Sequence, residues 1–297
     1  MLRRLITICL LLAPVAWPGC RPDGTPLSLP RPAADPPPRT PLPPLASQPA
    51  PSGELPQFRS VISLQILRVE LPVGTVNASE QLWNYLNEEP VAVNRSAELG
   101  RNGLRMGLGE APAWGEVSGM FQKLTGRALA PTRAFAWPGT VMDVVARKDR
   151  PAQSIFLFYA DKTRTGSDYP PGDNVFAVAC TVDETNPQGV ILTGVPQIRA
   201  TQSDFQPTRP DARMGVVTPY TRTPFAPLTF RVTIPPKGFL VIAPARAALN
   251  ASTLGHHFLI EQRDGLSFET VLIVVPEVIR KPIRPAGAED SASDAAP

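Results

Sequence analysis

Two adjacent histidines, His256 and His257, are the only imidazole side chains in the 297-residue chain, so they come first in a search for acid–base or metal chemistry. The local pattern predicts a strand over His257–Glu261, and neighbouring residues of a strand point to opposite faces. The two rings would therefore not chelate one ion, and we interpret them as strand-start or surface residues. A serine–histidine–aspartate site would also need a positioned serine, and nothing in the sequence places one beside them.

Three carboxylates, Asp161, Asp168 and Asp173, lie in a stretch rich in Gly, Pro, Ser and Thr. Oxygen-rich loops can hold Ca²⁺, but the DxDxDG order of a calcium-binding loop is missing here. We interpret the stretch as a solvated hairpin loop. The next polar group, Asp183–Asn186, is typical of an Asx-type turn.

The sequence signatures of common enzymes are missing from the chain. There is no HExxH, no GxSxG, no P-loop and no GxGxxG after a predicted strand. We therefore predict that the protein is not an enzyme and has no catalytic residue, no metal site and no cofactor. The net charge is only +3, without a Lys/Arg cluster on a regular element, so nucleic acid is not an expected partner.

The first twenty residues, Met1–Cys20, have the pattern of an export signal. Arg3 and Arg4 give a basic start, and Leu5–Val15 is an apolar run too short to span a hydrocarbon core of about 30 Å as a stable helix. The sequence therefore predicts a signal peptide and a chain exported to the cell envelope.

The end of this leader leaves three interpretations open. In the first, Pro18-Gly19-Cys20 is a degenerate lipobox, in which Trp17 replaces the usual aliphatic residue and Cys20 becomes a lipidated N-terminus. In the second, an ordinary signal ends at Ala16 and Cys20 is a plain thiol; in the third, the leader is an uncleaved anchor. We favour the first, which predicts lipidation of Cys20 and a protein tethered to the periplasmic face of a membrane.

The last of the three cysteines, Cys180, lies in the apolar run Val175–Cys180. Such a position predicts a buried, inert thiol. A disulfide between Cys20 and Cys180 is compatible only with plain secretion. Cys9 would leave with the signal peptide.

Composition divides the remaining chain. Residues 21–56 hold 13 prolines among 36 residues and are predicted to be a disordered linker with polyproline II character. We interpret this linker as a stalk, with a proline-motif ligand as the rival. Residues 57–130 are predicted to form a small α+β module, residues 131–283 a β-rich domain, and residues 284–297 a disordered tail.

The α+β module is predicted from changes of hydrophobic period. Ile62–Ile66 and Leu67–Leu71 alternate in opposite phases, which indicates a strand with a bulge or a bend. Asn77 is expected to cap a helix that follows it. The later elements of the module are a short helix Ser96–Arg101 with Asn102-Gly103 as its end, a strand Leu104–Leu108, and a helix ended by Gly126 with Trp114, Val117, Phe121 and Leu124 on its core face.

The β-rich domain shows no helical period, and its short apolar runs are bounded by Gly, Pro, Asn and Asp. The predicted strands are Val141–Ala146, Ser154–Ala160, Val175–Val182, Gly189–Ile198, Thr229–Ile234, Phe239–Ala243, His257–Glu261 and Thr270–Val278. Their spacing favours an antiparallel sandwich, or a sheet that closes in an oligomer. The predicted fold class is α+β: a small strand–helix–strand–helix module followed by a mainly antiparallel β-sandwich-like domain.

Four stretches carry a resemblance to a known family: Val178–Asp183, Gly189–Ile198, Phe230–Ile242 and Glu269–Pro276. They resemble the C-terminal domain of bacterial secretins, the ring-forming outer-membrane pores of secretion and pilus systems. The resemblance implies a homo-oligomeric ring, with Phe230–Ile242 as a hairpin. The loop at Leu254-Gly255 departs from the family, because it lacks the Val-Pro-x-Leu-Gly-Asp signature. The chain also resembles bacterial envelope lipoproteins, through Leu82-Trp83 and Asn102–Gly107.

The leading hypothesis is a non-enzymatic, membrane-tethered cell-envelope protein that presents a β-rich domain to other envelope proteins. The expected partners are a membrane, through a lipid on Cys20, and envelope proteins, with a homo-oligomer left open. The alternative is a secretin-like subunit of an outer-membrane secretion or pilus ring. A second alternative, supported only by the long polar loops, is an envelope hydrolase or a carbohydrate-binding protein.

Overall fold

The structure is a computed structural model that describes residues 58–201 and 220–282. The predicted leader with Cys20, the linker 21–56 and the tail 284–297 lie outside the described residues. The described residues all belong to one compact unit.

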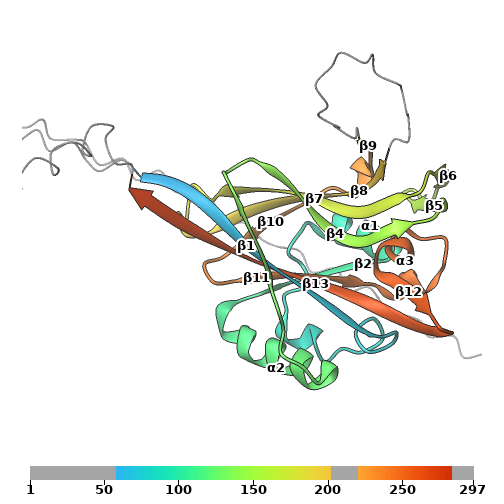
Figure 1. The fold of residues 1–297 in the computed structure, drawn as a ribbon, viewed down its shortest axis with the longest axis horizontal. Helices are drawn as coiled ribbons and strands as arrows, with labels where there is room; N and C mark the ends of the chain where they lie inside the picture. The colour runs from blue at the N-terminus through green and yellow to red at the C-terminus, as the bar shows by residue number, and fades with distance from the viewer. Residues whose placement is uncertain (1–57, 202–219, 283–297) are drawn as a thin grey trace, which may run out of the picture. The chain divides into compact units, whose positions relative to one another are not determined.

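Two antiparallel sheets make up the body of this unit (Figure 1). The first sheet has the order β2-β11-β13-β1-β3, with β12 added to β13, and the second has the order β10-β8-β7-β4, with β9 added to β8. The strands of the first sheet are β1 Phe58–Pro72, β2 Leu104–Gly109, β3 Thr132–Ala136, β11 Phe239–Pro244, β12 Ile260–Arg263 and β13 Leu266–Pro282. The strands of the second are β4 Val141–Arg150, β7 Gly172–Val182, β8 Val190–Thr201, β9 Tyr220–Pro224 and β10 Phe230–Ile234.

A separate hairpin and three α-helices complete the architecture. The hairpin pairs β5 Gln153–Phe158 with β6 Arg164–Tyr169. The helices are α1 Val93–Arg101, α2 Trp114–Thr125 and α3 Leu254–Leu259, with short 3₁₀ turns at Trp83–Tyr85, Ala111–Ala113, Ala226–Leu228 and Arg246–Leu249. The predicted α+β class with a mainly antiparallel, sandwich-like body is confirmed.

The longest strands, β1 and β13, run side by side through the first sheet (Figure 1). Their pairing extends from Phe58 opposite Pro282 to Pro72 opposite Phe268 without a register shift. The predicted bulge in β1 is therefore wrong. The phase of the apolar residues changes because different cores cover the two faces of the same strand.

The first core lies between the two sheets and receives Ile62 and Leu64 from β1. The second core lies on the other face of the first sheet, between that sheet and α2, and receives Leu67, Val69 and Leu71. Figure 1 shows α2 on this face of the sheet. Successive strand residues point to opposite faces of a sheet. The even-numbered apolar residues Ile62 to Ile66 therefore face the first core, and the odd-numbered ones from Leu67 to Leu71 face the second. β13 serves both cores in the same way, because it lies between β11 and β1 in the sheet.

The helix predicted after Asn77 is wrong. Only a 3₁₀ turn forms there, at Trp83–Tyr85. Asn77 is buried and its side chain caps nothing, because the carboxylate of Glu269 in β13 takes the role of acceptor. Glu269 is fully buried and accepts hydrogen bonds from the backbone N–H groups of Val76 and Asn77. Burial raises the pKa of the Glu269 carboxyl, while these amides act in the opposite direction.

The other two helices of the first segment form as predicted. α1 is three residues longer at its start than the expected Ser96–Arg101. α2 ends at Gly126, which adopts the left-handed conformation with φ of 66°. Val117 and Phe121 are buried in the second core, but Leu124 is exposed and does not belong to the predicted core face.

The expected division into a module of residues 57–130 and a domain of residues 131–283 is not how the described residues pack. β1 and β2 belong to the first segment, yet they pair with β13 and β11 of the second. The first sheet is therefore built jointly, because each segment alone leaves one face of its strands uncovered.

Two predictions for the second segment are also wrong. Phe230–Ile242 is not a hairpin, because β10 pairs with β8 in one sheet while β11 pairs with β13 in the other. The turn between them instead carries the chain from sheet to sheet. His257–Glu261 is not one strand, because the short helix α3 begins after Thr253, whose side-chain oxygen accepts a hydrogen bond from the backbone N–H of His256.

Candidate interaction surface

The two histidines lie on α3, where each ring binds a backbone carbonyl. The Nδ1 atom of His256 lies 3.0 Å from the Ala248 oxygen, and the Nε2 atom of His257 lies 3.0 Å from the Ser154 oxygen. The ring centroids are 5.8 Å apart. Both imidazoles therefore hold α3 against neighbouring segments.

His257 is the more strongly perturbed of the two rings. Its Nδ1 atom is buried without a hydrogen-bond partner in the described structure. Burial, followed by the nearby His256 and Arg150, lowers the pKa of His257 from 6.5 to about 4. A proton on His257 would place a positive charge in a buried position that already faces arginine.

We expect this histidine to make the folded state acid-sensitive. An unfolded chain binds a proton at His257 near pH 6.5, whereas the folded chain does so only near pH 4, so stability present above pH 6.5 is lost as the pH falls through this window. Allowing for the partial exposure of the ring, we expect a loss of about 1 kcal/mol between pH 6.5 and 5. Urea unfolding of the wild type and of His257→Gln at both pH values measures it.

The variant supplies the internal control for this prediction. Glutamine can still donate to the Ser154 carbonyl but cannot be protonated in this range. Other groups titrate equally in both proteins, so the difference between their pH slopes isolates His257. Identical slopes would contradict the assignment.

The three carboxylates considered for Ca²⁺ are not brought together. Asp161 accepts from Thr163, Asp168 accepts from Ser154, and Asp173 forms an ion pair with Arg199 at 2.6 Å. No group of three or more His, Cys, Asp or Glu that could hold a metal ion occurs among the described residues. Asp161 and Asp168 thus stabilise the β5–β6 hairpin, and Asp173 stabilises the start of β7.

Two further sequence predictions are confirmed, the Asx-type turn at Asp183–Asn186 and the buried thiol of Cys180. Asp183 accepts hydrogen bonds from the backbone N–H and the hydroxyl of Thr185, as an Asx-type turn requires. Cys180 is buried in the first core, and burial raises the pKa of its thiol to about 12. At neutral pH this thiol is protonated and unreactive.

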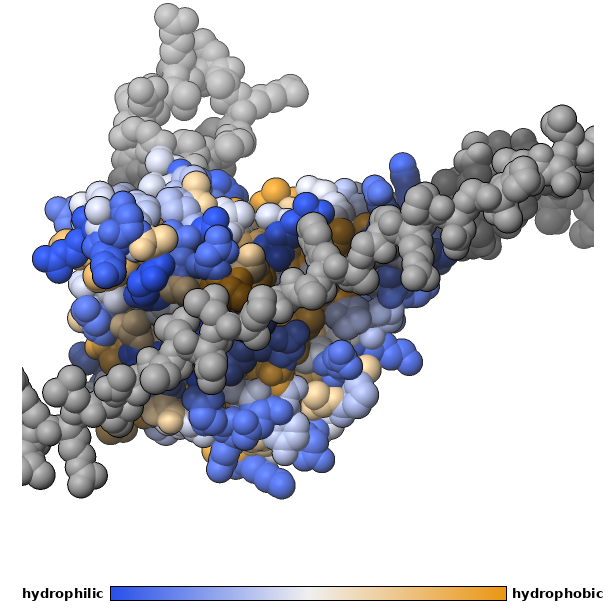
Figure 2. All heavy atoms as spheres, turned by 180° about the vertical axis from the view of Figure 1, so that it is seen from behind, coloured by the Kyte–Doolittle hydropathy of each residue, from blue (hydrophilic) through white to orange (hydrophobic). Residues whose placement is uncertain are grey.

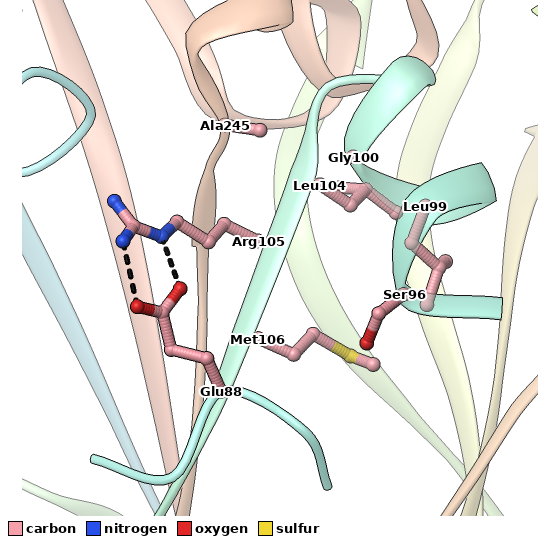
Figure 3. A pocket seen from close by; sticks show the side chains of 8 residues that line it. All are labelled: Glu88, Ser96, Leu99, Gly100, Leu104, Arg105, Met106 and Ala245. Atoms are coloured by element: carbon pink, nitrogen blue, oxygen red, sulfur yellow. Dashed lines mark hydrogen bonds and ion pairs between the residues drawn. The ribbon is translucent and has the colours of Figure 1, made fainter. Parts of the chain in front are cut away.

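A small pocket lies between α1 and β2 (Figure 3). Its volume is about 200 Å³, below the usual size of a small-molecule site. Its one cation, Arg105, is already bound: the guanidinium contacts Glu88 at 2.6 Å and Glu80 at 2.7 Å, and lies 4.0 Å above the ring of Trp83. The pocket therefore offers no free charge to a ligand.

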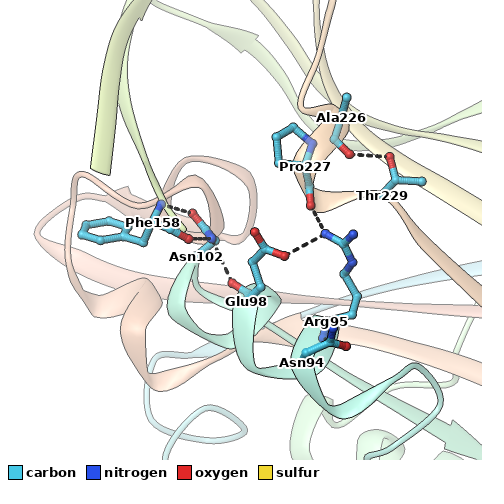
Figure 4. A network of polar contacts seen from close by, with 8 residues as sticks. All are labelled: Asn94, Arg95, Glu98, Asn102, Phe158, Ala226, Pro227 and Thr229. Atoms are coloured by element: carbon cyan, nitrogen blue, oxygen red, sulfur yellow. Dashed lines mark hydrogen bonds and ion pairs between the residues drawn. The ribbon is translucent and has the colours of Figure 1, made fainter. Parts of the chain in front are cut away.

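Asn102, the residue that follows α1, joins three elements (Figure 4). Its side-chain nitrogen donates to the carbonyls of Glu98 and Phe158 at 2.9 and 2.8 Å, and its side-chain oxygen accepts from the Phe158 N–H at 2.9 Å. Its backbone carbonyl accepts from the N–H of Gly255. The stretch Asn102–Gly107 is thus a structural junction between α1, β5 and α3.

The side of the sandwich formed by β3 and β4 is open. In the stacked sheets β13 contacts β8 and β1 contacts β7, so the β3 edge of the first sheet and the β4 edge of the second lie on the same side of the sandwich. Within the described ranges, β3 pairs only with β1, and β4 pairs only with β7. The opposite edge of the first sheet differs, because Asn87 exchanges backbone hydrogen bonds with Leu108 in β2.

Three large apolar side chains are exposed along the strands that border this open side. Phe135, Trp137 and Val141 are 64, 52 and 60% exposed; Phe135 lies on the outer face of the first sheet and Val141 on the outer face of the second. A hollow of about 510 Å³ adjoins Trp137, lined by Arg59, Ser60, Trp137 and Pro138. We call Arg59, Arg133, Phe135, Trp137 and Val141 the open-edge patch. Large exposed apolar clusters of this kind mark interaction sites in soluble proteins.

Sequence reasoning missed this patch. Two aromatic residues at a spacing of two, Phe135 and Trp137, stand between Pro131 and Pro138 and give the only local signal. Their exposure follows from β3 being an edge strand, which depends on pairing with β1. Hydrophobic residues also reach the surface on the face seen in Figure 2, where they lie between two hydrophilic regions.

No helix of the described residues is long and apolar enough to cross a membrane. No protein-family model and no curated protein sequence matches the chain.

Solved structures give only a weak resemblance, to secretin domains. The InvG secretin domain β-barrel of the Salmonella SPI-1 injectisome has 7% identity and a TM-score of 0.18, and the match covers 78% of this chain and 64% of that one. A near-atomic structure of InvG gives 9% and 0.20, covering 79% and 67%. The Klebsiella pneumoniae type II secretion outer-membrane complex of PulD, PulS and PulC gives 8% and 0.15, covering 76% and 38%.

The chain thus spans less than two thirds of the first of these structures. TM-scores this low do not show a shared fold, so the likeness carries no argument about function.

Proposed function

We propose that this chain is a non-enzymatic, membrane-tethered protein of the cell envelope that binds other envelope proteins through the open side of its β-sandwich. The observation that carries the proposal is the open-edge patch, in which Phe135, Trp137 and Val141 are more than half exposed beside two strand edges. Aromatic residues of this kind are enriched at the centres of protein interfaces.

The tether rests on the sequence. The leader Met1–Cys20 places a cysteine after Pro18-Gly19, and residues 21–56 give a proline-rich spacer before the folded unit. A lipid on Cys20 would hold the unit near a membrane, while the spacer would let it reach partners.

The experiment places a photo-crosslinking amino acid at position 135 of the full-length chain, expressed in its own envelope. We expect covalent adducts with another protein in the membrane fraction, because the partner covers Phe135. Cys20→Ala in the same background should move the protein and its adducts to the soluble fraction. Native mass in mild detergent then gives the number of copies.

The control carries the same crosslinker at Leu266, which is equally exposed at 63% but lies at the far end of β13. Equal adducts from both positions, or none from position 135, would refute the binding role. Retention of Cys20→Ala in the membrane would refute the lipid tether. A complex of a dozen or so copies would favour the ring-forming alternative over a tethered binding module.

A further inference from the structure

The edge of β3 offers unused backbone hydrogen-bonding groups. Residues 132–136 pair on one side with Ile66–Ile62 of β1, and no ladder occupies their other side within the described ranges. A strand with one neighbour leaves alternate N–H and C=O groups unpaired, and such an edge can accept an additional strand.

The neighbouring edge of β4 is protected over its second half but not over its first. Register shifts interrupt β4 between Val145 and Arg150, and this half carries Lys148 and Asp149. Bulges and charges are the usual means of keeping foreign strands from an edge. The unprotected edges are therefore β3 and the start of β4, where the open-edge patch lies.

The side chains of this patch follow the period of a strand. Arg133 and Phe135 share one face of β3, because they are two residues apart, and Trp137 continues the spacing. Ala136 points the other way and is buried. An added strand would thus meet a row of one cation and two aromatic rings.

The patch is also positively charged. The guanidinium of Arg59 lies 4.8 Å above the ring of Trp137. Among the described residues, no ion pair involves Arg59 or Arg133, whereas Arg68, Arg95 and Arg105 each have at least one. Two cations without a carboxylate beside exposed aromatic rings are complementary to an acidic, partly apolar ligand.

We propose that the β3 edge binds an extended segment of a partner protein, by adding it as a strand that carries both acidic and aromatic or aliphatic residues on the same face, at every second position. This inference rests on the proposed function and names the kind of partner. The backbone of the segment completes the ladder, its apolar side chains pack on Phe135 and Trp137, and its carboxylates meet Arg59 and Arg133. Specificity comes from the alternate side chains and affinity from the ladder.

A strand fits this surface better than a lipid membrane does. Burying Phe135 and Trp137 in a bilayer would bring the unpaired peptide groups of β3 towards hydrocarbon, where they have no partners. A polypeptide strand satisfies the same groups. The membrane therefore serves as a competing outcome in the test.

The test uses the purified full-length chain with Cys20→Ala and synthetic capped peptides of about eight residues, within the usual range of strand lengths. The first peptide carries Glu, Tyr, Val and Glu at every second position with Thr between them, the second replaces Glu by Lys, and the third replaces Thr by Pro. Fluorescence anisotropy gives affinities, and amide hydrogen exchange reports on residues 132–136. Vesicles of phosphatidylglycerol are titrated in parallel.

We expect the Glu peptide to bind about tenfold or more tightly than the Lys and Pro peptides, with added salt weakening it. It should slow exchange in β3, which side-chain contact alone would not do. Phe135→Ser and Arg59→Glu should each weaken binding by about tenfold. Leu266→Ser and Arg246→Glu, changes at exposed positions outside the patch, should alter it by less than about twofold.

Equal binding of the Glu and Lys peptides, unchanged exchange in β3, or binding to the vesicles alone would overturn the inference. Crosslinks from position 135 together with failure of every peptide would leave the binding role standing and reject strand addition. Peptide binding without crosslinks in the envelope would leave strand addition at the β3 edge standing and reject the proposed role in binding an envelope protein.

Discussion

Gly255→Ala should destabilise the folded unit by about 3 kcal/mol or more, because the new methyl group would meet backbone atoms that cannot move aside. A Cβ built at Gly255 lies 2.0 Å from the carbonyl oxygen and 2.7 Å from the Cα atom of Gly103. The same carbonyl accepts a hydrogen bond from the N–H of Ala245. Relief would have to separate α3 from the junction at Asn102-Gly103. Urea unfolding at pH 7 measures the loss.

The matched control is Gly119→Ala in α2. Apart from the adjoining backbone of its own helix, no atom lies within 4 Å of a Cβ built at Gly119. Alanine in a helix interior is favoured over glycine by about 0.5–1 kcal/mol, so this variant should be slightly more stable than the wild type. A Gly255→Ala protein that unfolds within 1 kcal/mol of the wild type, against the order-of-magnitude expectation for a backbone clash, would show that the close approach is wrong.

Asn102→Asp should cost about 3 kcal/mol at pH 7, although the two side chains have the same size. The side-chain nitrogen of Asn102 donates to two carbonyls, those of Glu98 and Phe158, and the residue is fully buried (Figure 4). A carboxylate would place its second oxygen against both carbonyl oxygens, at a fully buried position that has no donor. Chemical unfolding at pH 7 and pH 4 tests the effect.

The pH dependence separates this effect from a general loss of packing. The buried position would raise the pKa of the new carboxyl, so the penalty should be fully present at neutral pH and shrink as the pH falls. The comparison is made with the wild type at each pH, which removes the contribution of His257. Asn84→Asp, at an exposed position in the Trp83–Tyr85 turn, should change stability by less than about 0.5 kcal/mol. A penalty for Asn102→Asp that does not vary with pH would argue against a buried charge.

Elements with a strong local period were predictable from the sequence. β10 alternates cleanly through Phe230, Val232 and Ile234, which are all buried in the first core. α2 forms where its helical stripe predicts and ends at Gly126, although Leu124 of that stripe is exposed. In these elements local propensity and tertiary packing favour the same structure.

The failures have tertiary causes. β6 has no apolar alternation, since it is an exposed strand held by pairing with β5. α3 includes the start of the predicted strand His257–Glu261, because Thr253 caps the helix and both histidines bind carbonyls of other segments. The assignment of β10 and β11 to different sheets depends on their partners β8 and β13, which no local pattern specifies.

The open-edge patch was beyond sequence reasoning for the same reason. Phe135 and Trp137 could equally have faced a core, and only the order of strands leaves β3 and β4 at the same side. The histidines and carboxylates that attracted attention as chemical groups instead have structural roles. Chemistry-bearing residue types were thus a poor guide here, while the position of an edge strand was informative.

The uninterrupted pairing of β1 with β13 has a mechanical consequence. Because Phe58 lies opposite Pro282, the chain enters and leaves the folded unit at the same end of one antiparallel pair. A pulling force transmitted through these two points would break the 15 residue pairs one after another, like a zipper, rather than load them together in shear. A partner seated on the β3 edge would instead pull against β1 from its flank. The unit would therefore yield to tension along its own chain more readily than to tension from a ligand bound at its side.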